Sequence, residues 1–79
     1  MKRYYIAGSY AACIAHCARE QLNPRQPNVT LITGRYAFER IMAIRKRDEL
    51  RVLHPTPFDP ATLEGIAEAA GATISQRIA

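Results

Sequence analysis

Two short stretches of the chain repeat one pattern that could bind an anion. Residues 6–11 read Ile-Ala-Gly-Ser-Tyr-Ala and residues 32–37 read Ile-Thr-Gly-Arg-Tyr-Ala, so both follow I-x-G-x-Y-A. Each lies between an apolar run and a segment with helical periodicity, where a strand turns into a helix. The N–H groups and dipole at a helix N-terminus favour negatively charged ligands. The residues available to such a site stand at the ends of the apolar runs: Gly8, Ser9, Gly34, Arg35 and His54.

The same pattern also has an explanation that needs no ligand. Glycine permits a tight turn from strand to helix. A dinucleotide fingerprint needs three glycines as G-x-G-x-x-G, whereas each turn here has one, and no G-K-[ST] phosphate loop occurs. We expect Tyr10 and Tyr36 to pack in the first helical turns rather than to bind a base. We therefore interpret the repeat mainly as two strand ends, with a nucleotide or anion site as an alternative.

A second group of reactive side chains stands in the first helical segment, as Cys13-x-x-His16-Cys17. Thiolate and imidazole are zinc ligands, but a fourth ligand would have to come from elsewhere. The apolar residues on one predicted helical face are Ala11, Ile14, Ala15, Ala18 and Leu22. This pattern points His16 outward and places the cysteines at the flank. We predict small buried thiols beside an exposed histidine, with no metal and no cofactor.

Basic residues gather around the second helical segment. Residues 1–51 hold ten of the eleven Lys and Arg residues, and the net charge of the chain is +4. A basic face favours nucleic acid or an acidic protein as partner. It also serves simply as a solvated surface that keeps a small protein in solution. The residues of a candidate nucleic-acid surface are Arg40, Arg45, Lys46 and Arg47.

The elements that must position these groups alternate along the chain. We predict strands at 3–7, 28–33 and 50–54, and a short fourth strand or a tail at 73–78. Helices are expected over 9–22, about 35–47 and 59–71, counting their capping residues. Asp59 and Pro60 are typical of a helix start, and Gly71 of a helix end.

This order predicts one α/β domain over residues 1–79, a small three-layer open parallel sheet built as β-α-β-α-β-α-β. The second and fourth strands carry more polar residues, so we favour the strand order 2-1-3-4. The order 3-2-1-4 is the alternative. An exposed edge strand makes a homodimer or other homo-oligomer an expectation at this size.

The stretch Arg3-Tyr4-Tyr5-Ile6-Ala7-Gly8-Ser9-Tyr10, with the Ala-rich helix and Thr33-Gly34 after it, resembles small proteins of actinobacterial, including mycobacterial, bacteriophages. This resemblance implies a compact Rossmann-like domain and an accessory factor that acts on host machinery. The shorter stretch Tyr5-Ile6-Ala7-Gly8-Ser9-Tyr10 is similar to the first strand and turn of nucleoside 2-deoxyribosyltransferase-like proteins. There the glycine turn faces a nucleotide pocket, but this chain shows no matching catalytic Glu.

The residues thus provide no constellation for catalysis. Our leading hypothesis is a non-enzymatic protein-interaction module that binds a host protein in the cytoplasm of the host cell. The alternatives are a nucleotide or anion binder at the carboxyl ends of the strands and a nucleic-acid binder with a basic face. Two cysteines four residues apart on one helix do not suit an ordinary disulfide, which fits a reduced compartment. No apolar run is long enough to span a membrane.

Overall fold

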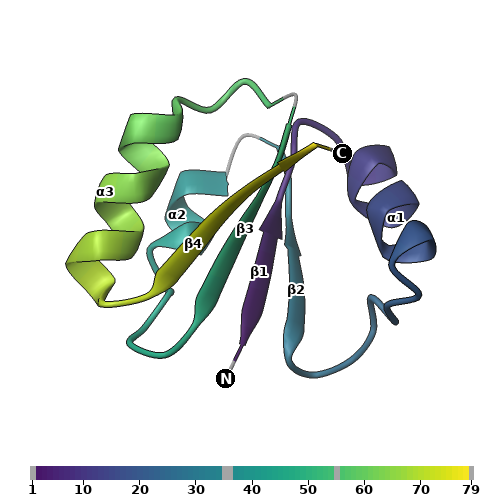
Figure 1. Ribbon diagram of the computed structural model, residues 1–79, viewed down its shortest axis with the longest axis horizontal. Helices are drawn as coiled ribbons and strands as arrows, with labels where there is room; N and C mark the ends of the chain where they lie inside the picture. Colours follow the sequence, from purple (N-terminus) through teal and green to yellow (C-terminus); the bar gives the residue numbers. More distant parts are fainter. Residues whose placement is uncertain (1, 35–36, 55, 79) are drawn as a thin grey trace.

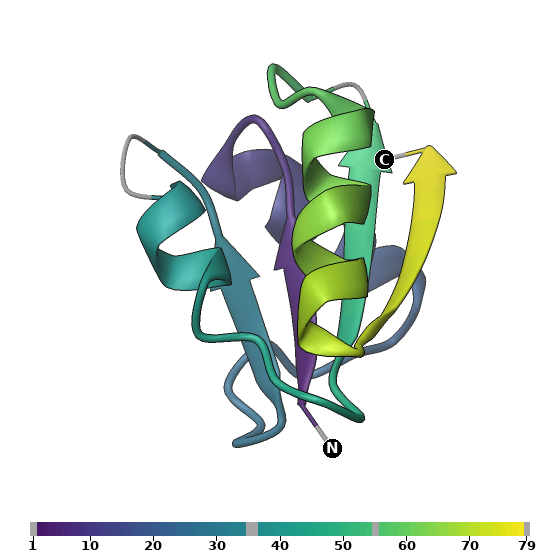
Figure 2. The same ribbon diagram turned by 90° about the vertical axis from the view of Figure 1, so that its left-hand side faces the viewer.

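The computed structural model describes residues 2–34, 37–54 and 56–78. Within them the chain forms a four-stranded parallel sheet with helices on both faces (Figures 1 and 2). Its elements in order are β1 (Arg3–Ile6), α1 (Tyr10–Arg19), β2 (Val29–Ile32), α2 (Ala37–Ile41), β3 (Glu49–His54), α3 (Pro60–Ala70) and β4 (Thr73–Ile78). The alternating α/β arrangement is therefore confirmed, including the fourth strand.

The strand order is β2-β1-β3-β4, so the favoured prediction 2-1-3-4 is confirmed. The central strand β1 places Ile6 beside Ile32 of β2 on one side and beside Val52 of β3 on the other. Strands inside a parallel sheet are buried on both faces and need apolar side chains on both. The polar residues of β2 and β4 are tolerated because those strands lie at the edges.

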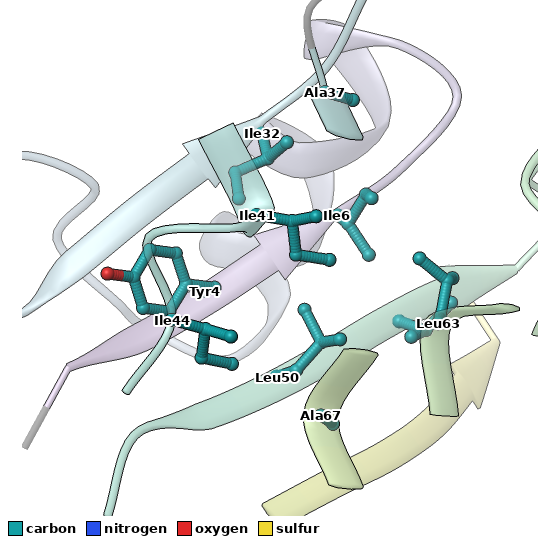
Figure 3. Close-up of a cluster of buried hydrophobic side chains, with 10 residues drawn as sticks. Tyr4, Ile6, Ile32, Ala37, Ile41, Ile44, Leu50, Leu63 and Ala67 are labelled. Atoms are coloured by element: carbon teal, nitrogen blue, oxygen red, sulfur yellow. The ribbon is translucent and has the colours of Figure 1, made fainter. Parts of the chain in front are cut away.

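Two apolar cores lie on opposite faces of the sheet. Tyr4 and Ile6 of β1 point into the larger core, beneath α2 and α3. Tyr5 of the same strand and Ala7, the residue that follows the strand, point into the smaller core beneath α1. Figure 3 shows the larger core, where Ile41 and Ile44 point toward the sheet. Successive side chains of β1 thus point to opposite faces of the sheet, each toward a different helical layer.

Helix α3 begins and ends as its sequence predicts. The carboxylate of Asp59 accepts hydrogen bonds from the backbone N–H of Ala61 and the hydroxyl of Thr62. Pro60 occupies the first helical position. Gly71 ends the helix with a φ of 74°, in the left-handed region that glycine adopts without steric cost. These contacts fix both ends of the helix, which lies in front of β3 and beside β4 in Figure 2.

Helix α2 is much shorter than predicted. It ends at Ile41 rather than at residue 47, and a connecting segment leads to β3. The buried carboxylate of Asp48 accepts backbone N–H groups from Arg45 at 2.9 Å and from Lys2 at 3.1 Å. Such bonds give the backbone an alternative to the helix. Ile44 remains buried in the core without belonging to a helix.

The buried face of α1 also differs from the prediction. Its buried residues are Cys13, His16 and Cys17, whereas Ala15 and Ala18 are exposed. The prediction that His16 points outward was wrong, and the prediction of buried thiols is confirmed. Alanine gains little from burial because it has almost no side chain, so an alanine face is a weak guide to a helix's orientation.

Candidate functional site

The strand ends that were predicted to form an anion site do lie at one edge of the sheet. The in-register pair of Ile6 with Ile32 brings the carboxyl ends of β1 and β2 to the same level, and β3 extends two residues beyond Val52, the partner of Ile6. Gly8 and Ser9 follow β1, Gly34 follows β2, and His54 is the last residue of β3. Arg35 and Tyr36 lie outside the described residues.

The two copies of I-x-G-x-Y-A do not form one cradle. The chain leaves β1 toward α1 on one face of the sheet, and leaves β2 toward α2 on the other (Figure 1). Gly34 has a φ of 86°, so the second turn does need glycine. The hydroxyl of Ser9 caps α1 by accepting the N–H of Ala12 at 3.2 Å. His54 pairs through Nε2 with the amide oxygen of Gln76 on β4.

Tyr10 is more accessible than the sequence led us to expect. It begins α1 directly after the first glycine turn, and 62% of its surface is exposed. The prediction that it packs in the first helical turn was wrong. An exposed aromatic ring beside a helix N-terminus is a surface on which a base can stack.

The Cys13-x-x-His16-Cys17 group lies inside the protein. Cys13 directs its thiol at the carbonyl oxygen of Tyr5, 3.9 Å away, and the ring of His16 lies against that of Tyr5. Burial raises the pKa of Cys13 to about 11, with a further contribution from Cys17. Burial likewise raises the pKa of Cys17. Both thiols are therefore protonated and unreactive near neutral pH.

A polar cluster occupies the same face of the sheet. Arg51 donates to the carboxylate of Glu49 at 2.6 Å and to the hydroxyl of Tyr5 at 3.5 Å. The hydrogen bond that Arg51 donates to Glu49 is the main reason that the pKa of Arg51 is raised. Arg3 approaches the same carboxylate at 3.7 Å. The single carboxylate of Glu49 is thus shared by two guanidinium groups, which ties β1 to β3. Among the described residues, no group of three His, Cys, Asp or Glu could hold a metal ion.

The candidate nucleic-acid residues are all exposed. Only Arg40 stands on a helix, because α2 ends at Ile41. Arg45, Lys46 and Arg47, called here the basic segment, belong to the connection between α2 and β3. The fold therefore presents these charges on an irregular segment, without the recognition helix that many DNA-binding motifs place in the major groove.

The structure adds a feature that the sequence analysis missed, a groove between α3 and the end of α2. It has a volume of about 350 Å³. Its lining is apolar and consists of Met42, Ile44, Gly65, Ile66, Ala69 and Ala70. We call it the α2–α3 groove. Figure 2 shows α2 and α3 on the same face of the sheet.

The groove is open because the residues that border it are short or turned outward. A Cβ atom added to Gly65 would meet nothing within 4 Å. Met42 is 70% exposed, although Ile44 two residues later is buried. The sequence signal that could have revealed this site is Gly65 itself, since a glycine within a helix weakens the helix and often has a packing or functional reason.

A second hollow of about 420 Å³ lies at the opposite edge of the sheet, where the strands begin. It is lined by Lys2, Tyr4, Ala43, Arg45 and Asp48. Asp48 already accepts two backbone N–H groups here, so its carboxylate is part of the fold. A negative group at this position opposes the binding of an anion by Lys2 and Arg45.

Comparison with known proteins finds no matching family model, curated protein or solved structure. Within the part of the chain that the structure describes, the helices are too short and too polar for any of them to cross a membrane.

Proposed function

We propose that this chain is a protein-interaction module that binds its partner through the α2–α3 groove and catalyses no reaction. The observation that carries the proposal is Met42, a large apolar side chain that is 70% exposed at the rim of an apolar groove. Apolar surface in water is unfavourable, and its concentration in a hollow is typical of binding sites. Methionine is flexible and polarisable, so it adapts to an incoming surface.

The core beneath the groove is complete without Met42. Ile41 and Ile44 on one side and Leu63 and Ala67 on the other are buried against the sheet. Folding alone therefore gives no reason for an apolar residue at position 42. If the resemblance to small phage proteins holds, the partner is a protein of the host cell.

Site-specific photo-crosslinking tests this function. A photo-reactive amino acid would replace Met42 in one variant and exposed Ala15, on the opposite layer, in a matched control. In extracts of the natural cell, the position-42 probe should form one defined protein adduct that the position-15 probe does not form. The substitution Gly65→Gln should abolish the adduct, because it fills the groove. Equal adducts from both positions, or none, would refute a docking function for the groove.

A nucleotide or anion site at the carboxyl ends of β1 and β3 is the second candidate. The chain leaves β1 toward one face and β3 toward the other, and ligands of open α/β sheets bind at such a switch point. Gly8, Ser9 and His54 flank this point, and the exposed ring of Tyr10 stands beside it. Nucleotides or inorganic phosphate should then raise the unfolding temperature, and Tyr10→Ala should reduce the rise for nucleotides. No rise with any phosphate compound would reject this candidate.

A further inference from the structure

We propose that the partner inserts an amphipathic helix into the α2–α3 groove, with two apolar anchor residues and a row of acidic residues along one flank. This inference rests on the docking function proposed above and specifies the chemistry of the occupant. Three properties of the groove support it: its backbone surroundings, its length and the charges beside it.

The surroundings of the groove favour a helix over an extended peptide. An extended segment gains most of its affinity by adding to a free sheet edge, where its backbone finds partners. The strands beneath this face, β1 and β3, are each paired on both sides. A helix satisfies its own backbone hydrogen bonds and needs only an apolar groove. Gly65 and Ala69 lie four residues apart on α3, one above the other, so a second helix can approach closely.

The length of the groove limits the number of anchors. The lining residues of α3 run from Gly65 to Ala70, which corresponds to about 8 Å along the helix axis. Two side chains at positions i and i+4 of a partner helix are about 6 Å apart along its axis. The groove therefore accommodates two anchors, whereas a third anchor at i+7 would lie beyond its end.

Charge determines which flank of the partner is acidic. The exposed basic segment follows Ile44 directly, and the stem of Lys46 lies against the end of α3, since a Cβ on Gly71 would be 3.5 Å from its Cγ. The acidic residues of α3, Glu64 and Glu68, are exposed. Each precedes a groove residue by one position and is therefore turned about 100° away from it. An acidic row facing the basic segment is attracted on one side and avoids the α3 carboxylates on the other.

The same charges disfavour a second copy of this chain as the occupant. Each copy has a net charge of +4 and carries its own exposed basic segment. Like charges brought within a Debye length, about 8 Å at physiological ionic strength, repel one another. An acidic helix of a different protein removes that repulsion and gains attraction.

A displayed library of helical peptides tests this proposal on the full chain. Each peptide has 18 positions, with the apolar anchor spacing varied and the flanking positions drawn from Glu, Gln and Lys, and selection uses the immobilised protein. We expect enriched peptides to carry two apolar residues at i and i+4 with Glu along one flank. The double charge reversal Arg45→Glu with Lys46→Glu should weaken their binding about tenfold.

Matched variants make the test specific. Arg19→Glu with Arg25→Glu changes the net charge equally at exposed positions of α1 and its following loop, and should change binding less than about twofold. Gly65→Gln should abolish binding, while Gly65→Ala should preserve it, because only the longer side chain fills the groove. Retained thermal unfolding transitions would show that each variant is folded.

The opposing outcomes are distinct. Enrichment of basic, neutral or extended peptides, or no enrichment, would overturn the acidic-helix proposal. Peptide binding that is unchanged by Gly65→Gln would overturn the proposal as well. A dimer in sedimentation experiments that Gly65→Gln dissociates would identify a second copy as the occupant. The position-42 crosslink can also yield a partner whose affinity is unchanged by the Arg45 and Lys46 charge reversal. That result would support the docking function and refute the acidic helix. The absence of any position-42 adduct would refute the docking function itself.

Discussion

The imidazole ring of His16 lies against the phenol ring of Tyr5, with centroids 5.5 Å apart and planes inclined by 45°. This contact joins α1 to the central strand β1, and both residues are buried. Aromatic pairs in tilted geometry are favourable beyond the surface that they bury. The contact explains why α1 directs His16 and both cysteines inward, with Ala15 and Ala18 in solvent.

Removal of the His16 ring should destabilise the fold strongly. We expect His16→Ala to lower the free energy of unfolding by about 2 kcal/mol, since it leaves a cavity and loses the Tyr5 contact. Ala15→Lys is the control at the adjacent exposed position, and should change that free energy by less than about 0.5 kcal/mol. Urea unfolding followed by circular dichroism measures both. A larger loss of unfolding free energy in Ala15→Lys than in His16→Ala would mean that α1 buries its alanine face instead.

Stability should fall in alkaline solution because of Cys13. Its pKa is raised from the ordinary 9.0 to about 11 in the folded protein. Below pH 9 the thiol is neutral in both states, whereas between pH 9 and 11 the unfolded chain loses a proton that the folded chain keeps. The loss approaches about 2 kcal/mol near pH 11. Burial also raises the pKa of Tyr4, which acts in the same direction.

The contribution of Cys13 to this alkaline loss is the difference in unfolding free energy between wild type and Cys13→Ala, followed as the pH rises. The urea midpoint of wild type should decline more steeply from pH 8.5 to 10.5 than that of the variant, as judged from the pKa of about 11. If the urea midpoints of wild type and variant declined in parallel, the Cys13 thiol would not be the cause of the alkaline loss of stability. Alkylation of native protein at pH 8 should also be slow and become fast in urea.

Asp48 should be critical for the stability of the fold. Asp48→Ala removes the acceptor of the N–H groups of Lys2 and Arg45, and should cost about 1–3 kcal/mol of unfolding free energy. Glu39→Ala, at an exposed position of α2, should cost far less. Amide hydrogen exchange gives a direct measure, because the amide of Arg45 should lose protection in Asp48→Ala. Unchanged protection there would show that the bond contributes nothing.

Two substitutions at helix ends should act in opposite directions. Gly71 ends α3 with a φ of 74°, while Gln21, just after α1, has a φ of 55°. A side chain in this region costs about 1–2 kcal/mol. Gly71→Ala should therefore lower the unfolding temperature, and Gln21→Gly should raise it. Differential scanning calorimetry compares the two, and a decrease in both would refute the conformational explanation.

Met42 should contribute to binding and not to folding. Because its side chain is 70% exposed, Met42→Gln should change the free energy of unfolding by less than about 0.5 kcal/mol. Leu63→Ala, in the core beneath the groove, should cost about 2–5 kcal/mol. In binding assays with peptides selected on the wild type, Met42→Gln should weaken affinity. A large loss of stability in Met42→Gln would mean that this residue belongs to the core.

The sequence by itself determined the alternating architecture and the ends of α3, and it favoured the strand order that the structure has. These features depend on local signals: apolar strand residues, a polar bias in the edge strands, and the Asp59, Pro60 and Gly71 caps. Each acts within a few residues, so it can be recognised without knowledge of distant contacts. The repeated I-x-G-x-Y-A correctly marked two strand ends at one edge of the sheet.

Only the tertiary structure decided the orientation of α1, the early end of α2 and the position of the groove. His16 turned inward because Tyr5 of β1 provides a ring for it to pack against. Helix α2 stopped short where Asp48, next to β3, accepts the N–H groups of Arg45 and of the distant Lys2. The groove exists because Met42 and Gly65, 23 positions apart in the sequence, come to border the same hollow. Contacts between residues far apart in the chain outweigh local periodicity wherever small residues leave that periodicity ambiguous.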